Sequence, residues 1–361
     1  MKIFTRGYTG VSSCADSVAV SAPKRSSYNI GWMLLRPLIC FEVILEHFWA
    51  KGDSIPAWQV PLDYMLSLSV PVFMFMAFYL GERHITTDEP EYIRRRVWRV
   101  AWPLVGWGLI YFAVLVPFRW LRGHEVPGVD DLLWQMTTGH SELLNPSMWY
   151  QSVLLILTLA FFYTFRKPVR QNALVILTLL CGAFVMEYAG LNEYLFGDMR
   201  YELKYPLGRV AEMVPFAVMG YACARYGLLE RLPAGRVLAV ALPVIVSVMA
   251  MIYLYDEKNL GFGYSNIFYV PAALGLVVAV WYIPFPHVGE SVLRVLRFLS
   301  SFTLGIYCMH RLVMAFVQPA GRMIFPGLGA FGLCVITDIV SFIASWLISK
   351  LPWKWAADLV R

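Results

Sequence analysis

Apolar residues in this chain come in long runs that are separated by short polar or charged segments. Most of these runs are close to the roughly 20 residues that a helix needs to cross about 30 Å of hydrocarbon. The pattern predicts an all-α polytopic membrane protein with about ten transmembrane helices. Their expected positions are 32–50, 58–81, 98–118, 148–165, 171–190, 206–225, 236–255, 265–283, 298–317 and 328–349.

Composition agrees with this prediction, because 59% of the 361 residues are hydrophobic and only 15% are charged. A soluble globular domain needs less apolar surface than that. Residues 1–27 are rich in small and polar residues and predict a disordered cytoplasmic tail, while residues 28–361 predict a single membrane domain. The six cysteines are scattered singly, which predicts buried apolar side chains and no disulfide framework.

Charge along the loops predicts the orientation of the chain. Lysines and arginines gather in the tails and in alternate loops, such as RHITTDEPEYIRRRVWR and the C-terminal KLPWKWAADLVR. Positive loops stay on the cytoplasmic side, so both termini are predicted to lie inside. One outer loop, residues 119–147, is long, and its phrase DDLLWQM has helical spacing that suits a membrane surface.

The first apolar run contains four ionisable residues in the stretch RPLICFEVILEHFWA. A charge near the bilayer centre costs about 2.5–3.5 kcal/mol on insertion scales, so such residues usually face the bundle and are often functional. Arg36 and His47 are eleven residues apart, which places them on one helix face about 16 Å apart. Glu42 and Glu46 form a second stripe, where at least one is expected to be protonated or paired with another helix.

Residues from other spans are needed to orient His47, because Glu46 points elsewhere. The candidates are Glu212, Asp338 and His310. Glu212 has Arg209 three residues before it, and these two can simply satisfy each other. Asp338 has no local partner and can equally pair with an arginine of another span. The sequence leaves these alternatives open.

The basic run RRRVWR at 94–99 leads into the third predicted span. Arg95, Arg96 and Arg99 lie at the start of a helix on roughly one face, and such a cluster suits a ligand with several phosphates. An equally simple interpretation is a cytoplasmic anchor that meets anionic lipid headgroups.

Several phrases together resemble the acyltransferase-3 family of bacterial integral membrane acyltransferases. The Arg36-to-His47 spacing, SVPVFMFMAFYLGER at 69–83, RRVWRVAWP from Arg95, MWYQSVLLIL from 148 and TLGIYCMH at 303–310 match family phrases in order. The resemblance is closest to the branch of the enterobacterial common antigen O-acetyltransferase, which lacks an appended soluble domain. The chain departs from the pattern at Ala77 and Phe78, where the family usually has Ser-Gly.

The resemblance implies an acyltransferase for groups other than aminoacyl groups. It would move an acyl group, usually acetyl, from cytoplasmic acetyl-CoA to a hydroxyl of a cell-surface or lipid-linked carbohydrate. The expected location is the bacterial inner membrane. The expected partners are the acyl-CoA donor, the carbohydrate or glycolipid acceptor and membrane lipid. No permanently bound cofactor, no metal site and no nucleic-acid partner is expected.

Site roles follow from the same resemblance. His47 is expected to be the general base in a direct transfer, with a transient acyl-His as the alternative, and Tyr307 or His310 to stabilise the oxyanion or move a proton. The donor is expected to be bound by Arg36, Arg95, Arg96 and Arg99, and the acceptor by Trp149 and Glu46. The competing class is a transporter or exporter of a glycan, although no inverted repeat is detectable. A purely structural membrane protein is a third alternative.

Overall fold

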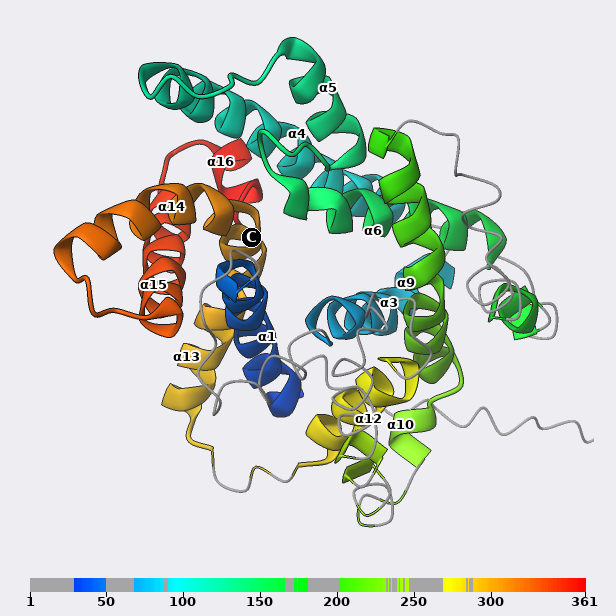
Figure 1. Ribbon diagram of the computed structural model, residues 1–361. Coiled ribbons are helices and arrows are strands. Elements are labelled where there is room, and N and C mark those ends of the chain that lie inside the picture. Colours follow the sequence, from blue (N-terminus) through cyan, green and yellow to red (C-terminus); the bar gives the residue numbers. More distant parts are fainter. Residues whose placement is uncertain are drawn as a thin grey trace, which may run out of the picture.

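The computed structural model describes residues 29–49, 68–86, 90–165, 201–231, 269–283 and 288–361, with Phe285 and parts of 172–180 and 233–246. Every principal element in these ranges is a helix, which agrees with the predicted all-α class (Figure 1). The principal helices are α1 (Ile30–Trp49), α3 (Ser69–Thr86), α4 (Pro90–Leu121), α5 (Val129–Thr138), η1 (Pro146–Met148), α6 (Trp149–Thr164), α9 (Tyr201–Arg225), α10 (Leu228–Arg231), α12 (Tyr269–Tyr282), α13 (Glu290–Ser300), α14 (Thr303–Ile324), α15 (Ala330–Ile348) and α16 (Lys354–Asp358).

Within the described ranges, three helical segments are long and apolar enough to cross a membrane: Glu91–Leu121, Pro146–Thr164 and Ala330–Ile348. The number rises to four if α13 and α14, which meet at a bend of 50°, form one span. Helix α1 has the length but is not among them, since every stretch of span length in it contains Arg36, Glu42 and Glu46.

Part of the predicted organisation lies outside the described residues. This is the case for the tail at 1–27 and for most of the predicted spans at 171–190 and 236–255. The predicted total of ten spans and the inside location of both termini therefore stay predictions.

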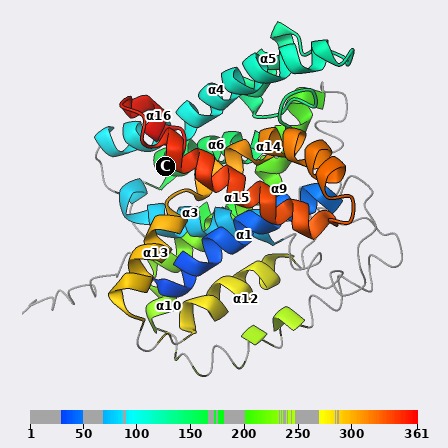
Figure 2. The same ribbon diagram turned by 90° about the vertical axis from the view of Figure 1, so that its left-hand side faces the viewer.

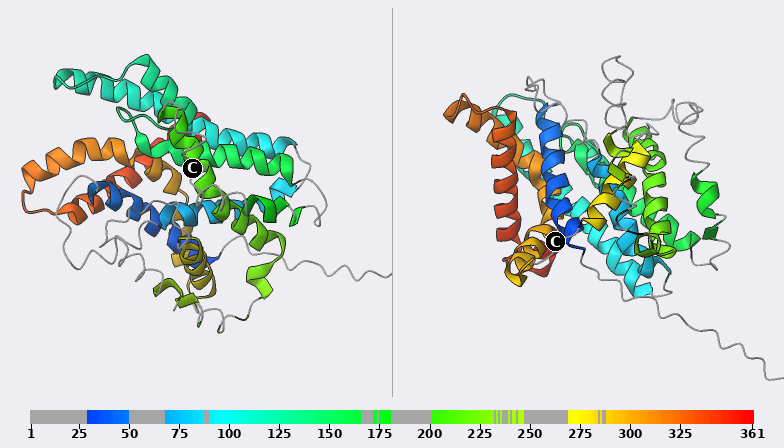
Figure 3. Two further views of the ribbon diagram at one scale, coloured as in Figure 1. Left: turned by 45° about the vertical axis from the view of Figure 1, so that its right-hand side comes forward. Right: turned by 90° about the horizontal axis from the view of Figure 1, so that it is seen from below.

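Helix α1 lies inside the bundle, in contact with α3, α12, α13, α14 and α15. Figure 1 and the right-hand view of Figure 3 show α14 and α15 on one side of α1 and α3 with α9 on the other, and Figure 2 looks at the molecule from the side of α15. Helices α3 and α9 approach closely because Gly220 has no side chain; a Cβ there would lie 2.2 Å from the Phe75 carbonyl oxygen. Helix α1, which carries Arg36 and His47, is therefore surrounded by packed helices.

The loop between α4 and α6 contains helix α5, which confirms the helix predicted from DDLLWQM. The Gly128 N–H donates to the Asp131 carboxylate over 2.9 Å and so satisfies one of the free N–H groups at the start of the helix. Gly139 ends the helix with φ 72°. A Cβ at Gly139 would lie 2.4 Å from the Met148 carbonyl oxygen. Glycine thus allows the chain to fold back onto the start of α6.

The cysteines of the described ranges behave as predicted. Cys40, Cys223, Cys308 and Cys334 are buried free thiols. The other two, Cys14 and Cys181, lie outside these ranges.

Candidate active site

The ring of His47, near the end of α1, meets residues from two distant segments. Its Nε2 atom lies 2.9 Å from the Ser147 Oγ of η1. The same ring stacks on His310 of α14, with centroids 5.2 Å apart and planes at 5°. Tyr307, one turn before His310, donates its hydroxyl hydrogen bond to the Ser147 carbonyl. We call these four residues, His47, Ser147, Tyr307 and His310, the His47 centre.

Asn145 fixes the turn that carries Ser147. Its side-chain oxygen accepts a hydrogen bond of 2.9 Å from the Ser147 N–H, as expected at the N-terminus of a short helix. Its side-chain amide donates to the Cys308 carbonyl of α14 over 3.4 Å, and its own N–H donates to Gln135 of α5 over 3.0 Å. Because Asn145 is fully buried, water does not compete for these bonds. Ser147 is therefore held relative to both α5 and α14.

Helix α14 is tied to α4 at the turn after Tyr307. The Tyr111 hydroxyl donates to the Cys308 carbonyl over 3.0 Å and accepts from the Leu312 N–H over 2.9 Å. A regular helix joins these two backbone groups directly, so the phenol of α4 is inserted into the hydrogen-bond ladder of α14. This insertion lies in the turn that contains His310 and fixes the position of that turn relative to α4.

His310 is fully buried, and its ring has a defined tautomer. Nδ1 lies 2.6 Å from the Tyr307 carbonyl oxygen. Since a carbonyl only accepts, Nδ1 carries the hydrogen and Nε2 carries the lone pair. Nε2 has no hydrogen-bond partner among the described residues. It can therefore accept a proton but cannot donate a hydrogen bond in this tautomer.

Tyr150 of α6 links the His47 centre to two arginines. Its ring lies 5.7 Å from the Tyr307 ring, centroid to centroid. The guanidinium groups of Arg36 and Arg96 both interact electrostatically with its phenol. Arg96 also donates to the Ala77 carbonyl of α3 over 3.1 Å. Tyr150 thus interacts with both arginines and with Tyr307 of the His47 centre.

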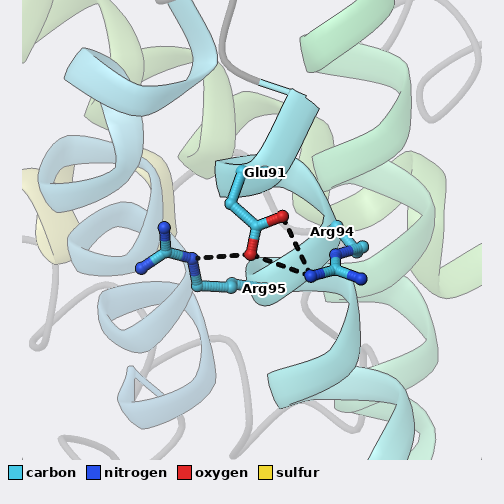
Figure 4. Close-up of polar contacts among 3 residues, drawn as sticks. All are labelled: Glu91, Arg94 and Arg95. Carbon is cyan, nitrogen blue, oxygen red and sulfur yellow. Dashed lines mark hydrogen bonds and ion pairs between the residues drawn. The ribbon is translucent and has the colours of Figure 1, made fainter.

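The predicted arginine cluster is divided between two places. Arg96 turns into the bundle, whereas Arg95 and Arg99 are exposed. The reason is helix geometry, because residues four apart share a face while adjacent residues are turned by about 100°. Glu91 pairs with Arg94 at 3.0 Å and with Arg95 at 3.3 Å on the exposed side (Figure 4).

The exposed arginines line a cleft of about 840 Å³ between α4, α6 and α16, which we call the basic cleft. Its lining comprises Glu91, Ile93, Arg94, Arg95, Val97, Trp98, Arg99, Ala101, Leu159, Tyr163, Lys354 and Asp358. The excess of cations and the two aromatic rings suit a planar, anionic ligand. Lys354 brings the C-terminal helix into this surface.

The two residues predicted to bind the acceptor lie in different surroundings. Trp149 is only 6% exposed, and the Arg209 guanidinium lies 5.3 Å from the centroid of its ring. Arg209 in turn pairs with Glu212 at 2.6 Å, as the sequence allowed. Glu46 is partly buried and interacts electrostatically with Glu42, one turn earlier on α1.

Asp338, the other carboxylate considered for orienting His47, lies on α15. It interacts electrostatically with the thiols of Cys40 and Cys334. The contacts with His47 described above come from Ser147 and His310.

Comparison with known protein families decides the class of the protein. The family model for the acyltransferase domain (Acyl_transf_3) matches residues 29–349. The chain belongs to this acyltransferase family. Its apolar helices and this domain make it a membrane acyltransferase, and the matched range includes the whole His47 centre. No curated protein and no solved structure matches the chain.

Several residues of the candidate site are absent from the sequence predictions. They are Ser147, Asn145, Tyr150, Tyr111 and Lys354. Asn145-Pro146 is a recognisable helix-start signal, so the cap itself could have been predicted. The contact of Ser147 with His47 joins residues 100 positions apart, and no local pattern announces it.

Proposed function

We propose that the protein transfers an acetyl group from cytoplasmic acetyl-CoA to a hydroxyl of a cell-surface or lipid-linked carbohydrate, with His47 as general base. The observation that carries this proposal is the position of His47 within an acyltransferase domain. Its ring is held between a hydrogen bond to Ser147 and a parallel stack on His310. A base with a fixed orientation is what general-base catalysis requires.

The proposed reaction is a direct transfer. His47 removes the proton of the acceptor hydroxyl while the oxygen attacks the thioester carbonyl. The new C–O bond forms, the C–S bond breaks, and the proton passes to the departing thiolate of CoA. Tyr307 holds the Ser147 turn through its hydroxyl. His310, with a lone pair on Nε2, suits proton transfer better than stabilisation of the oxyanion.

The donor is proposed to enter from the α4 side of the molecule. Arg95, Arg99 and Lys354 of the basic cleft supply cations for the nucleotide phosphates. Arg36 and Arg96, which interact with Tyr150, supply positive charge further inward. The rise of about 16 Å from Arg36 to His47 is comparable to an extended pantetheine arm. Acetyl-CoA is a substrate in this scheme, so no permanently bound cofactor is needed.

The acceptor and the location follow from the resemblance noted above. We propose a surface glycan or its lipid-linked precursor as acceptor, as in the enterobacterial common antigen branch, and the bacterial inner membrane as location. Trp149 and Glu46, near the ends of α6 and α1 that meet at His47, are the proposed acceptor contacts. Membrane lipid surrounds the apolar helices.

The test uses purified full-length protein, labelled acetyl-CoA and an envelope extract as source of acceptor. The variant is His47→Ala, and the control is His124→Ala, an exposed histidine in the segment between α4 and α5. We expect His47→Ala to lower CoA release and labelling of the extract by about 100-fold to 10,000-fold, the usual contribution of general-base catalysis. His124→Ala should act like the wild type. Unchanged turnover in His47→Ala would refute the proposal, and glycan export without CoA release would favour a transporter.

A further inference from the structure

Ser147 binds three residues through its three polar groups: His47, Tyr307 and Asn145. Its hydroxyl oxygen lies 2.9 Å from the His47 Nε2 atom. Its carbonyl accepts the hydrogen bond of Tyr307, and its N–H donates to Asn145 over 2.9 Å. The residue is 5% exposed. Each of its polar groups therefore has its own partner, and the hydroxyl is the one that reaches the histidine of α1.

We propose that Ser147 is the positioning residue of His47 and holds its ring by accepting a hydrogen bond from Nε2–H. This inference rests on the proposed function of His47 as general base. With the hydrogen on Nε2, the lone pair lies on Nδ1, and Nδ1 is the atom that takes the proton of the acceptor hydroxyl. As the ring gains its proton, the charge strengthens the bond from Nε2–H to the serine oxygen. Ser147 then favours the protonated ring without touching the substrate.

The rigidity of Ser147 makes it suited to this task. A short 3-10 turn alone would hold the Ser147 hydroxyl loosely. Here Asn145 anchors the turn to the Cys308 carbonyl of α14. Tyr307 anchors it a second time from the same helix. His310, which lies one turn after Tyr307, contacts the ring of His47 over its flat face. Helix α14 thus fixes the plane of the His47 imidazole through His310. It also fixes, through Tyr307, the Ser147 residue whose oxygen meets the edge of that ring.

The same pair of atoms, a serine oxygen beside a histidine nitrogen, is also found where serine acts as a nucleophile. Two observations favour positioning instead. A serine nucleophile usually needs N–H donors beside it for the oxyanion, and the Ser147 N–H is already used by Asn145. Ser147 is also less accessible than His47, which is partly exposed. Serine ester formation is therefore an outcome that the test must be able to detect.

The test compares Ser147→Ala and Ser147→Thr with a matched control, Ser152→Ala. Ser152 is 2% exposed, lies in the first turn of α6, and its hydroxyl has no hydrogen-bond partner among the described residues. Full-length variants are assayed in membranes supplied with labelled acetyl-CoA, and kcat and KM for acetyl-CoA are measured per amount of folded protein. Labelled Ser147 is sought by mass spectrometry after incubation without acceptor.

We expect Ser147→Ala to lower kcat by about tenfold to 100-fold, the scale of a misplaced catalytic group, with KM changed less than about twofold. Ser147→Thr retains a hydroxyl and should recover to within about threefold of the wild type, and Ser152→Ala should equal the wild type. Equal kcat values for Ser147→Ala and Ser152→Ala would overturn the positioning role. So would an acetyl ester on Ser147, or a loss that Ser147→Thr does not rescue. Full activity of His47→Ala would instead refute the proposed function itself.

Discussion

The His47 centre and the basic cleft differ in how their polar groups are held. In the His47 centre, side chains from α1, η1 and α14 meet at three buried residues, Ser147, Tyr307 and His310, and packed helices hold them in place. In the basic cleft, long charged side chains lie at the surface, where Arg94 is 77% and Arg95 is 68% exposed. The first arrangement suits a reacting group that must be oriented, whereas the second suits the attraction of an anion.

This difference in burial predicts different free-energy costs for substitutions in the two regions. Exposed ion pairs contribute about 0–1 kcal/mol because water and salt screen them, and their long side chains lose entropy when fixed. A buried polar group that loses its partner costs about 1–3 kcal/mol, and more when it is charged. Substitutions in the His47 centre should therefore act on kcat or on stability, and substitutions in the basic cleft on KM.

Arg96, which is partly buried in the bundle, and Arg95 of the basic cleft test the contrast between buried and exposed polar groups on adjacent residues. We expect Arg96→Met to destabilise the protein by about 1.5–3 kcal/mol, because a charged donor to the Ala77 carbonyl is lost in a partly buried place. Arg95→Met removes only exposed contacts and should leave the melting temperature in detergent unchanged. Thermal melting followed by tryptophan fluorescence is the measurement. Equal shifts for the two variants would show that Arg96 is not held by α3.

Tyr307 and Tyr163 make a second matched pair, one from each region. Tyr307→Phe removes the hydroxyl that binds the Ser147 carbonyl, so the turn beside His47 loses one anchor. We expect kcat to fall about tenfold, equivalent to about 1.4 kcal/mol, with KM for acetyl-CoA nearly unchanged. Tyr163→Phe alters a side chain that lines the basic cleft and should leave kcat unchanged. A larger effect in Tyr163→Phe would reverse the assignment of the two regions.

Helical periodicity allowed part of the site to be predicted, because spacing within one helix fixes which side chains share a face. The spacing predicts one stripe for Arg36 and His47, and both lie on α1, which packs inside the bundle. The phrase TLGIYCMH placed Tyr307 and His310 on one helix, and α14 contains both. Apolar runs likewise indicated helices near α4, α6 and α15. These are all properties of a single segment.

Contacts between segments could not be predicted in the same way. The run RRRVWR predicts one cluster of arginines. Adjacent residues on a helix point about 100° apart, so the Arg96 side chain points into the bundle while Arg95 is exposed. Ser147 is one of many serines in the sequence, and only the packing of η1 against α1 brings it to His47. The predicted span at 298–317 begins within α13, whereas α14 begins at Thr303, because the chain bends by 50° between the two helices. Such features depend on which helices become neighbours.

The basic cleft should show its role through salt and KM. We expect the double variant Arg95→Gln/Arg99→Gln to raise KM for acetyl-CoA by about threefold to tenfold at low salt, because two cations of the proposed phosphate site are lost. The kcat value should stay within about twofold. The control, Arg294→Gln/Arg297→Gln on α13, removes the same charge from exposed positions of another helix. An equal rise of KM in the control would indicate a general effect of net charge.

Glu91 should give the smallest effect and the finest comparison within the basic cleft. Its carboxylate pairs with Arg94 at 3.0 Å and with Arg95 at 3.3 Å (Figure 4), so it would compete with the proposed anionic donor for the same cations. We expect Glu91→Gln to lower KM for acetyl-CoA by at most about twofold, since exposed pairs are worth less than about 1 kcal/mol. The melting temperature should not change.

A rise of KM in Glu91→Gln would mean that the carboxylate arranges the two arginines instead of competing for them. Comparing Glu91→Gln with Glu142→Gln, an exposed carboxylate in the loop before η1, separates this local effect from the loss of one negative charge. If the two variants have the same KM for acetyl-CoA, the ion pairs of Glu91 do not affect donor binding. If only Glu91→Gln binds more tightly, and the gain disappears at high salt, the basic cleft is the surface that attracts the phosphates.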